Sequence, residues 1–444
     1  MRAWFIPVVF LLAALNSIAA PIRAGTAKAL ITPHSRAWLA GFPGRARPAE
    51  PASGDIFARA LALEDGSGGR AVVLSVELLA IPRAVSERVA AELMKAHGLE
   101  RGQIVINASG TCSGPFLKGL LPVLAPNGTN EQREIADYTT TVARSLVELA
   151  SLSLANMQPA RLSFASGAAA FAVKSRVHEH AGDSDLNTTI ANAVPVLRVA
   201  TIQGDIVALV FGYACRNAVL GVESDTIGGD YAGIAATTLE RDYPGSVALF
   251  LRLCDGDRSP AESGSKALEN RYGVSLAAEV KRLLSLPMQP ISGRLRATLI
   301  EISLAFVPHT RKQFEAESKS DDPQLARRAS LVLRAYDARL EPRTLPYSLQ
   351  AIRIGKGFAL IALAGEPVIA YAVKMRKMLG QKDLIVAGGT TDAGYVVPDA
   401  DADDFKSRHL ADSIIYSGFP GAFTIETEER ILGAVERVWK RLGK

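Results

Sequence analysis

Two stretches that follow strand-like runs carry side chains suited to chemistry. The apolar run 103–108 leads into 109–115, Ser-Gly-Thr-Cys-Ser-Gly-Pro, and a second run leads into 254–260, Cys-Asp-Gly-Asp-Arg-Ser-Pro. Loops at strand ends often hold functional residues, but ordinary turns have the same composition. The thiol of Cys112 and the hydroxyl of Ser259 are possible nucleophiles. A nucleophile of this kind needs a base, and no histidine stands beside either residue in the sequence.

Three further segments add charged and polar groups. Residues 211–217, Phe-Gly-Tyr-Ala-Cys-Arg-Asn, leave another strand-like run, and 228–233 opens a helix. Glu366 stands at the end of a strand, directly before a helix N-terminus, where a negative charge is favoured, so capping is one explanation for it. Tyr395 lies in a tight loop, where packing is the alternative to a functional role.

Alternating strand and helix patterns must position these residues, and they predict a mixed α/β domain. No period of about 20–50 residues indicates a repeat protein. An edge strand is expected over 24–33, ended by Pro33. Other strands are expected over 56–64, 71–79, 103–108, 162–172, 196–202, 206–213, 247–253, 295–305, 348–354, 358–364 and 384–387. Helices are expected over 82–97, 135–154, 274–284, 367–379 and 427–442, with charged helices over 313–337 interrupted by Pro323.

The composition is that of a globular protein, with 48% apolar and 21% charged residues among 444. A net charge of +5 without a long basic run gives no support to nucleic-acid binding, although a mildly basic surface is compatible with contact at a membrane surface. Residues 1–20 have the charge, apolar core and small residues of a signal peptide, so we expect an exported protein, periplasmic or secreted. No other run approaches the length of a transmembrane segment.

The three cysteines, Cys112, Cys215 and Cys254, fit an exported protein in two ways. One disulfide and one free thiol is the default expectation, and three buried free thiols is the alternative. The sequence holds no Cys-x-x-Cys motif, so a standard structural zinc site is not indicated.

Taken together, these segments resemble the N-terminal domain of the neutral/alkaline, non-lysosomal ceramidases. The resemblance covers nearly all of 21–444 and implies mixed β-sheets flanked by helices, without the C-terminal immunoglobulin-like domain of that family. It rests on ordered motifs at compatible spacing, at 25–33, 58–65, 109–115, 215–221, 229–233, 256–260, 365–366 and 394–395.

The resemblance implies a zinc amidase that cleaves the N-acyl bond of ceramide or a related lipid amide. In that family two histidines, a glutamate and a tyrosine hold the zinc ion, which activates a water molecule. Glu366 resembles the glutamate ligand and Tyr395 the tyrosine. The catalytic candidates are Ser259, Arg176 and Asp257, and the candidates that line the substrate pocket are Cys112, Ser113 and Arg216.

Neither zinc-binding histidine is present at its expected position. The family's His-Thr-His-Ser-Gly-Pro corresponds to Gly-Thr-Cys-Ser-Gly-Pro at 110–115, and Arg216 stands where the second histidine would be. Because zinc sites usually have three or four protein ligands, we expect zinc to be absent or weakly bound. His178 and His180 are possible substitutes, or ordinary surface histidines. Arg216 is expected to hydrogen-bond with Glu366 or Tyr395 and so to replace the lost positive charge.

Three functions are compatible with these residues. The first is an exported hydrolase of ceramide-like amides. The second is a catalytically inactive protein of the same fold that binds a lipid or another partner. The third is a metal-independent hydrolase with Ser259 or Cys112 as the nucleophile, and it lacks an evident base.

Overall fold

The computed structural model describes residues 22–45, 47–50, 54–174, 189–390, 394–400 and 408–443. The expected signal peptide lies outside these ranges. Arg176, His178 and His180, which the sequence offered as site candidates, also lie outside them.

A large mixed sheet contains nine strands in the described part of the chain, in the order β4-β3-β2-β1-β5-β7-β8-β9, with β11 also paired to β5. The prediction that the first strand lies at an edge is wrong, because β1 pairs with both β2 and β5. Pro33 follows the strand without entering its ladder, so the proline does not force an edge position. The strands are β1 Ile22–Leu30, β2 Phe57–Glu64, β3 Arg70–Val76, β4 Ile104–Ala108, β5 Gln158–Ala168, β7 Ala193–Thr201, β8 Ile206–Tyr213, β9 Val247–Arg252 and β11 Gln289–Ile291.

A smaller sheet has the order β12-β13-β14-β16 within the described residues. Its strands are β12 Leu295–Ala305, β13 Thr344–Ile354, β14 Phe358–Leu363 and β16 Leu384–Ala387. The predicted hairpin is present, since β13 and β14 pair antiparallel, and β16 adds in parallel. Two short pairs accompany the sheets: β6 Ala172–Lys174 with β10 Arg258–Pro260, and β15 Glu366–Pro367 with β17 Val396–Val397.

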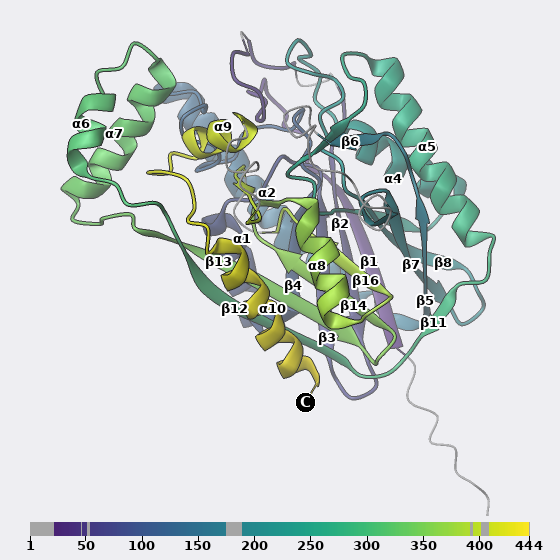
Figure 1. Ribbon diagram of the computed structural model, residues 1–444. Coiled ribbons are helices and arrows are strands. Elements are labelled where there is room, and N and C mark those ends of the chain that lie inside the picture. Colours follow the sequence, from purple (N-terminus) through teal and green to yellow (C-terminus); the bar gives the residue numbers. More distant parts are fainter. Residues whose placement is uncertain are drawn as a thin grey trace, which may run out of the picture.

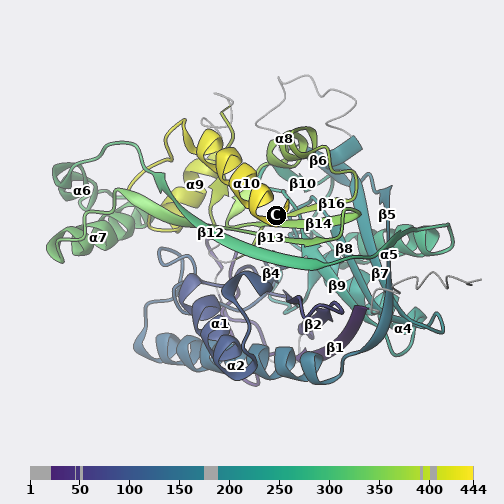
Figure 2. The same cartoon turned by 90° about the horizontal axis from the view of Figure 1, so that it is seen from below.

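The two sheets face each other, and helices cover their outer faces (Figures 1 and 2). Apolar residues of both sheets, including Leu61, Val105, Leu249, Ile352 and Leu360, form one continuous core between them. Helices α1 and α2 cover one part of the large sheet, α4 and α5 another, and α8 and α10 the small sheet. The helices are α1 Arg83–His97, α2 Thr129–Ala155, α4 Asp230–Asp242, α5 Lys266–Leu284, α6 Arg311–Glu317, α7 Pro323–Asp337, α8 Ile369–Leu379, α9 Arg408–Tyr416 and α10 Thr427–Gly443, with the 3-10 helix η1 Arg101–Gln103.

Helix boundaries follow local chemistry. Gly98 ends α1 in the left-handed conformation at φ 62°, as its position in the sequence predicts. The interruption expected at Pro323 is present, since α6 ends at Glu317 and Pro323 starts α7, where its missing N–H costs nothing in the first turn. The Asp322 side chain accepts hydrogen bonds from the first backbone N–H groups of that helix.

The large sheet curls until its last strand returns to its first strands. The hydroxyl of Ser75 on β3 donates to the Phe250 carbonyl on β9 over 2.6 Å. The Arg252 amide donates to Oδ1 of Asn107, at the end of β4, over 2.9 Å. Because the ends of β4 and β9 meet in this way, the loops that leave both strands lie together.

All three cysteines lie in the described part of the chain, and all are free and buried. The default expectation of one disulfide is therefore wrong, and the alternative of three buried thiols holds. Among the described helices, none has the length and apolar character that crossing a membrane requires.

Candidate functional site

The ends of β4, β9, β15 and β16 converge on Glu366. Single bridges join Asn107 to Thr390 and Leu253 to Ala387, so the ends of both sheets are tied together. The turn after β9 lies directly against β15, because the Gly256 amide donates to the Pro367 carbonyl over 3.1 Å. A Cβ atom on Gly256 would collide with the carbonyl oxygen of Glu366. The close approach of this turn to β15 therefore requires glycine.

Arg252 connects the two carboxylates of this region. Its Nε lies 2.9 and 2.8 Å from the two oxygens of Asp255, and its Nη2 lies 3.1 Å from Oε2 of Glu366. The three side chains are buried, with exposed fractions of 2% for Arg252, 0% for Asp255 and 7% for Glu366. Such charges are stable inside a protein only when they are paired and hydrogen-bonded, as they are here.

Burial and charge compete in setting the protonation of this group. Burial opposes the charge of Arg252, but Asp255 and Glu366 together outweigh it and raise the pKa of the guanidinium. Burial also favours the neutral form of Glu366, yet Arg252, with help from His409 and Arg216, lowers the pKa of that carboxyl well below its usual range. For Asp255 burial prevails over Arg252 and raises the pKa to about 6. Glu366 is therefore a permanent anion, held by a permanent cation.

The fold provides dedicated space for the Arg252 side chain. A Cβ on Gly110 would lie 2.9 Å from Nε of Arg252 and 3.0 Å from its Cδ and Cζ. A Cβ on Gly389 would lie 3.0 Å from Cδ of the same side chain. Both glycines have positive φ, +81° and +65°. Asn107 fixes the backbone below, since its Nδ2 donates to the Gly388 carbonyl over 2.6 Å. The guanidinium thus occupies the space next to Gly110, the position at which the resemblance expects a histidine.

Tyr395 and His409 approach Glu366 from the last part of the chain. The Glu366 amide donates to the Tyr395 carbonyl over 2.9 Å, and the Tyr395 ring packs against Phe419 and Phe423. Nε2 of His409, on α9, lies 3.8 Å from Oε2 of Glu366. Burial, followed by the charge of Arg216, lowers the pKa of His409 although Glu366 acts in the other direction. The imidazole is therefore neutral at physiological pH.

The sequence predicted that Arg216 would contact Glu366 or Tyr395, and in the structure Arg252 makes the contact with Glu366. Within the described chain no hydrogen bond or ion pair joins Arg216 to Glu366, and the Arg216 backbone amide donates to Arg258. Arg216 still influences the site through its charge, which acts on Glu366, His409 and Cys112. The arginine that contacts Glu366 is thus Arg252, which reaches the carboxylate from the end of β9.

The remaining sequence candidates are placed as follows. Cys112 is buried, and burial raises the pKa of its thiol to about 11 although Arg216 opposes this, so the thiol is protonated near neutral pH. Ser113 is buried, and its carbonyl accepts from the Gly228 amide. Asp257 accepts a hydrogen bond from the Ile369 amide at the start of α8. Ser259 lies on the short strand β10, opposite Val173.

The residues around Glu366 do not fit a zinc ion. Oε2 of Glu366 is paired with the Arg252 guanidinium, and Gly110 has no side chain that could bind a metal. Arg216 stands at the position where the resemblance expects the second histidine. Across the described residues no three His, Cys, Asp or Glu side chains are grouped so that they could hold a metal ion. The guanidinium of Arg252 would repel a cation at the carboxylate and already fills the space beside Gly110.

Sequence reasoning missed Arg252, Asp255 and His409. An arginine inside the apolar run Val-Ala-Leu-Phe-Leu-Arg-Leu was the available signal for Arg252, because buried strands rarely contain an unpaired charge. Asp255 was visible in the acidic turn, where Asp257 was chosen instead. His409 follows 401–407 in the sequence and has no spacing that relates it to Glu366.

Two solved structures are similar to this chain over most of its length. One is the neutral ceramidase from Pseudomonas aeruginosa, with a TM-score of 0.70, 17% identity, and coverage of 93% of this chain and 75% of that one. The other is a ceramidase complexed with C2, with a TM-score of 0.71, 17% identity, and coverage of 92% and 73%. No protein-family model matches the sequence, and no match was found among curated proteins.

The chain therefore has the neutral ceramidase fold. The predicted fold class, mixed sheets flanked by helices, is confirmed by these neighbours and by the observed topology. At 17% identity this likeness concerns the fold, so the chemistry of the site has to be derived from the residues present.

Proposed function

We propose that the protein binds a ceramide-like lipid amide around Glu366 and does not hydrolyse it with zinc. The observation that carries the proposal is the Arg252 guanidinium, which contacts Glu366 at 3.1 Å beside Gly110. The ceramidase fold over 93% of the chain supports the ligand class, because the similar proteins are ceramidases by name.

The side chains near Glu366 suit recognition of an amide. An amide presents one N–H donor and one carbonyl acceptor, and it is bound best by an acceptor and a donor held in fixed positions. Glu366 supplies an acceptor. Nη1 of Arg252 is buried and has no acceptor among the described residues, so one donor of this guanidinium is unused. A buried donor of this kind stabilises the complex when a ligand or a water molecule satisfies it.

The same side chains offer little for covalent catalysis. The thiol of Cys112 is protonated near neutral pH, and a thiol is a weak nucleophile compared with a thiolate. The guanidinium cannot act as a base, because it stays charged at any physiological pH. These properties favour binding over turnover.

A ceramidase-like amidohydrolase is the second candidate. It is favoured by the adjacency of Glu366 and Tyr395, joined by a 2.9 Å backbone hydrogen bond, and by His409 at 3.8 Å from the carboxylate. If the imidazole replaced a missing histidine, this arrangement would supply three donors of the types that the zinc amidases use.

One preparation distinguishes the two functions. Protein purified in the presence of zinc and then dialysed is analysed for metal, and the same sample is assayed for hydrolysis and for binding of a fluorescent ceramide. Saturable binding without turnover and without stoichiometric zinc supports the proposal. Stoichiometric zinc together with release of fatty acid would establish the hydrolase, and absence of saturable binding would remove the lipid amide as the ligand.

The composition of 1–20 supports export of the protein, which would place the site in the periplasm or outside the cell. A lipid ligand would then be taken from a membrane surface by peripheral contact. Mass spectrometry of the purified chain, with cleavage expected close to Pro21, checks the first step.

A further inference from the structure

A cavity of about 350 Å³ lies between α1 and the paired strands β12 and β13, and none of the residues around Glu366 lines it. One wall is a single stripe of α1, formed by Arg83, Glu87, Ala90 and Met94. The opposite wall comes from the small sheet, where Leu299 and Glu301 lie on one face of β12. The volume lies within the range of small-molecule binding sites.

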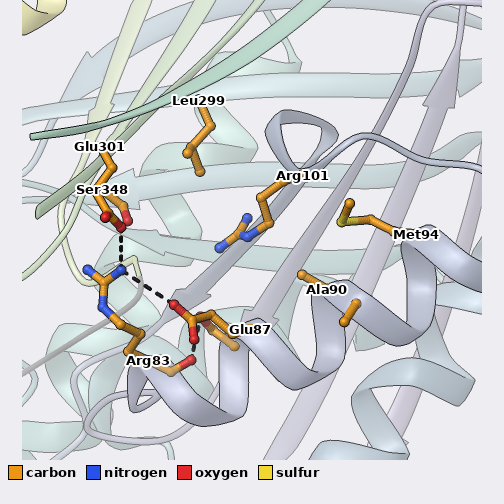
Figure 3. Close-up of a pocket in the computed structure, with 10 residues that line it drawn as sticks. Arg83, Glu87, Ala90, Met94, Arg101, Leu299, Glu301 and Ser348 are labelled. Carbon is orange, nitrogen blue, oxygen red and sulfur yellow. Dashed lines mark hydrogen bonds and ion pairs between the residues drawn. The ribbon is translucent and has the colours of Figure 1, made fainter. Parts of the chain in front are cut away.

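At one end of this cavity the charged side chains are paired with one another. Nη1 of Arg83 lies 2.6 Å from Glu301 and 3.5 Å from Glu87 (Figure 3). Its Nη2 donates to the Pro346 carbonyl over 2.6 Å. Arg83 thus pairs with both glutamates and also hydrogen-bonds to the backbone of β13. An anionic ligand gains little at Arg83, because the two carboxylates beside this guanidinium would repel it.

The other end holds a cation without a carboxylate. Arg101, on η1, extends into the cavity between Leu299 and Ala90 (Figure 3). Its Nη1 donates to the Ile104 carbonyl over 2.9 Å, and no ion pair involves Arg101 anywhere in the described ranges. Burial lowers the pKa of Arg101 more than Glu87 raises it. A half-buried guanidinium with free donors is the usual partner of a planar anion.

The space next to this guanidinium is apolar. Ala90 and Ala91 present only methyl groups, so they leave room above the helix, and Met94 is exposed although it is a large apolar side chain. Leu299 closes the space from the side of the sheet. Met side chains adapt to ligands of different shape. An alkyl chain that covered Met94 and Leu299 would remove their apolar surface from water.

We infer that this cavity binds a small amphipathic monoanion, with a carboxylate on Arg101 and an alkyl chain over Ala90, Met94 and Leu299. The formal charges of Arg83, Arg101, Glu87 and Glu301 sum to zero, so a monoanion leaves a modest net charge, whereas a dianion such as an alkyl phosphate faces more repulsion from the two glutamates. The inference goes beyond the proposed function and does not depend on it.

Calorimetric titration of the mature protein with octanoate tests this inference. We expect saturable binding of one octanoate per chain, and at least tenfold weaker binding of acetate, octanol and octyl phosphate. Arg101→Gln should weaken octanoate binding about tenfold to a hundredfold, because a charge-assisted hydrogen bond is lost. The matched control is Arg88→Gln, since Arg88 lies on α1, the helix that forms one wall of the cavity, but is exposed, pairs with Glu92 and does not line the cavity.

Each outcome bears on the inference. Equal affinity in Arg101→Gln and the unchanged protein would overturn it, as would tighter binding of octyl phosphate or the absence of saturable octanoate binding. Ala91→Trp provides a second variant, because Ala91 is exposed and lines the cavity, so the larger ring should fill the space without disturbing the core. Loss of octanoate binding in Ala91→Trp with unchanged ceramide binding would separate this cavity from the site at Glu366.

Discussion

Replacement of Arg252 by methionine should expose the energetic role of the buried cation. Methionine has a similar length and fills the space beside Gly110 and Gly389, so the change removes the charge with little change in volume. It leaves the carboxylates of Asp255 and Glu366 buried without their partner, at the positions where Arg252 holds them at 2.8 and 3.1 Å.

The expected loss in the free energy of unfolding is about 3–5 kcal/mol near neutral pH, the usual cost of removing one partner from a buried ion pair. The loss should shrink as the pH falls, since unpaired buried carboxyls have a raised pKa and become neutral at mildly acidic pH. Linkage gives this direction. A carboxyl whose pKa is higher in the folded state than in the unfolded state adds its full stabilisation below the unfolded pKa. That stabilisation is lost as the pH rises through the folded pKa.

Urea denaturation at two pH values, with and without zinc, provides the measurement. Arg59→Met is the matched control, because Arg59 is equally buried and also pairs with two carboxylates, those of Glu77 and Glu240. Both variants should be destabilised, but zinc should restore stability only in Arg252→Met, where His409 lies close to the freed carboxylate. If Arg252→Met were as stable as the unchanged protein, or if the unchanged protein bound zinc stoichiometrically, the assignment of Arg252 as the fixed cation would be refuted.

Three other changes test separate parts of the structure. Gly110→Ala should destabilise the protein by about 1–3 kcal/mol more than Gly68→Ala, as measured by urea denaturation. Both glycines have φ near +80°, but only a Cβ at Gly110 collides with Arg252. Equal losses of stability in the two variants would contradict the steric role of Gly110. Burial raises the pKa of Glu269 to about 7, so the carboxyl is neutral at low pH and its stabilising contribution is lost as the pH rises through about 7. Glu269→Gln should therefore stabilise the protein by about 1 kcal/mol at about pH 8 and hardly at about pH 5, and a pH-independent effect in thermal melts would argue against this pKa. Cys112 should react with a disulfide reagent only after denaturation, because its thiol is buried with a pKa of about 11; rapid labelling in the native state would reopen its role as a nucleophile.

Much of the fold was readable from periodicity. The strands β8, β12 and β14 and helices α1, α8 and α10 lie within two residues of the predicted bounds, because each has a clear apolar pattern and a local stop such as Gly98. Strand β13 ends where predicted but begins at Thr344, four residues before the predicted start. Helix α2 begins at Thr129, six residues before the predicted start, since the polar first turn carries no apolar periodicity. Sheet order was not readable, and the edge position predicted for β1 was wrong because pairing is decided by contacts distant in sequence.

The site was predictable only where motifs carried it. Motifs led to Glu366 and Tyr395 as candidates, and the structure places their backbones next to each other, since the Glu366 amide donates to the Tyr395 carbonyl. Arg252 was not found, because its partners Asp255 and Glu366 come from two loops, and the space that admits it depends on glycines far away in the sequence. No single stretch contains this information. A charged residue at the end of an apolar strand was the one sign available beforehand.

A guanidinium and a metal ion can each neutralise a buried carboxylate, but their chemical properties differ. Both neutralise the buried Glu366, but arginine is covalently fixed, planar and charged at every physiological pH, whereas a metal exchanges and keeps open coordination positions. In the proposed function Nη1 of Arg252 orients a ligand oxygen, but a guanidinium does not lower the pKa of a bound water molecule as a Lewis acid does. The two glycines that admit Arg252 and the aspartate that holds Nε at 2.8 and 2.9 Å from its two oxygens make the arrangement part of the fold. Because the fold provides both space and partners for this side chain, we favour a site that recognises a ligand over a hydrolase site without its metal.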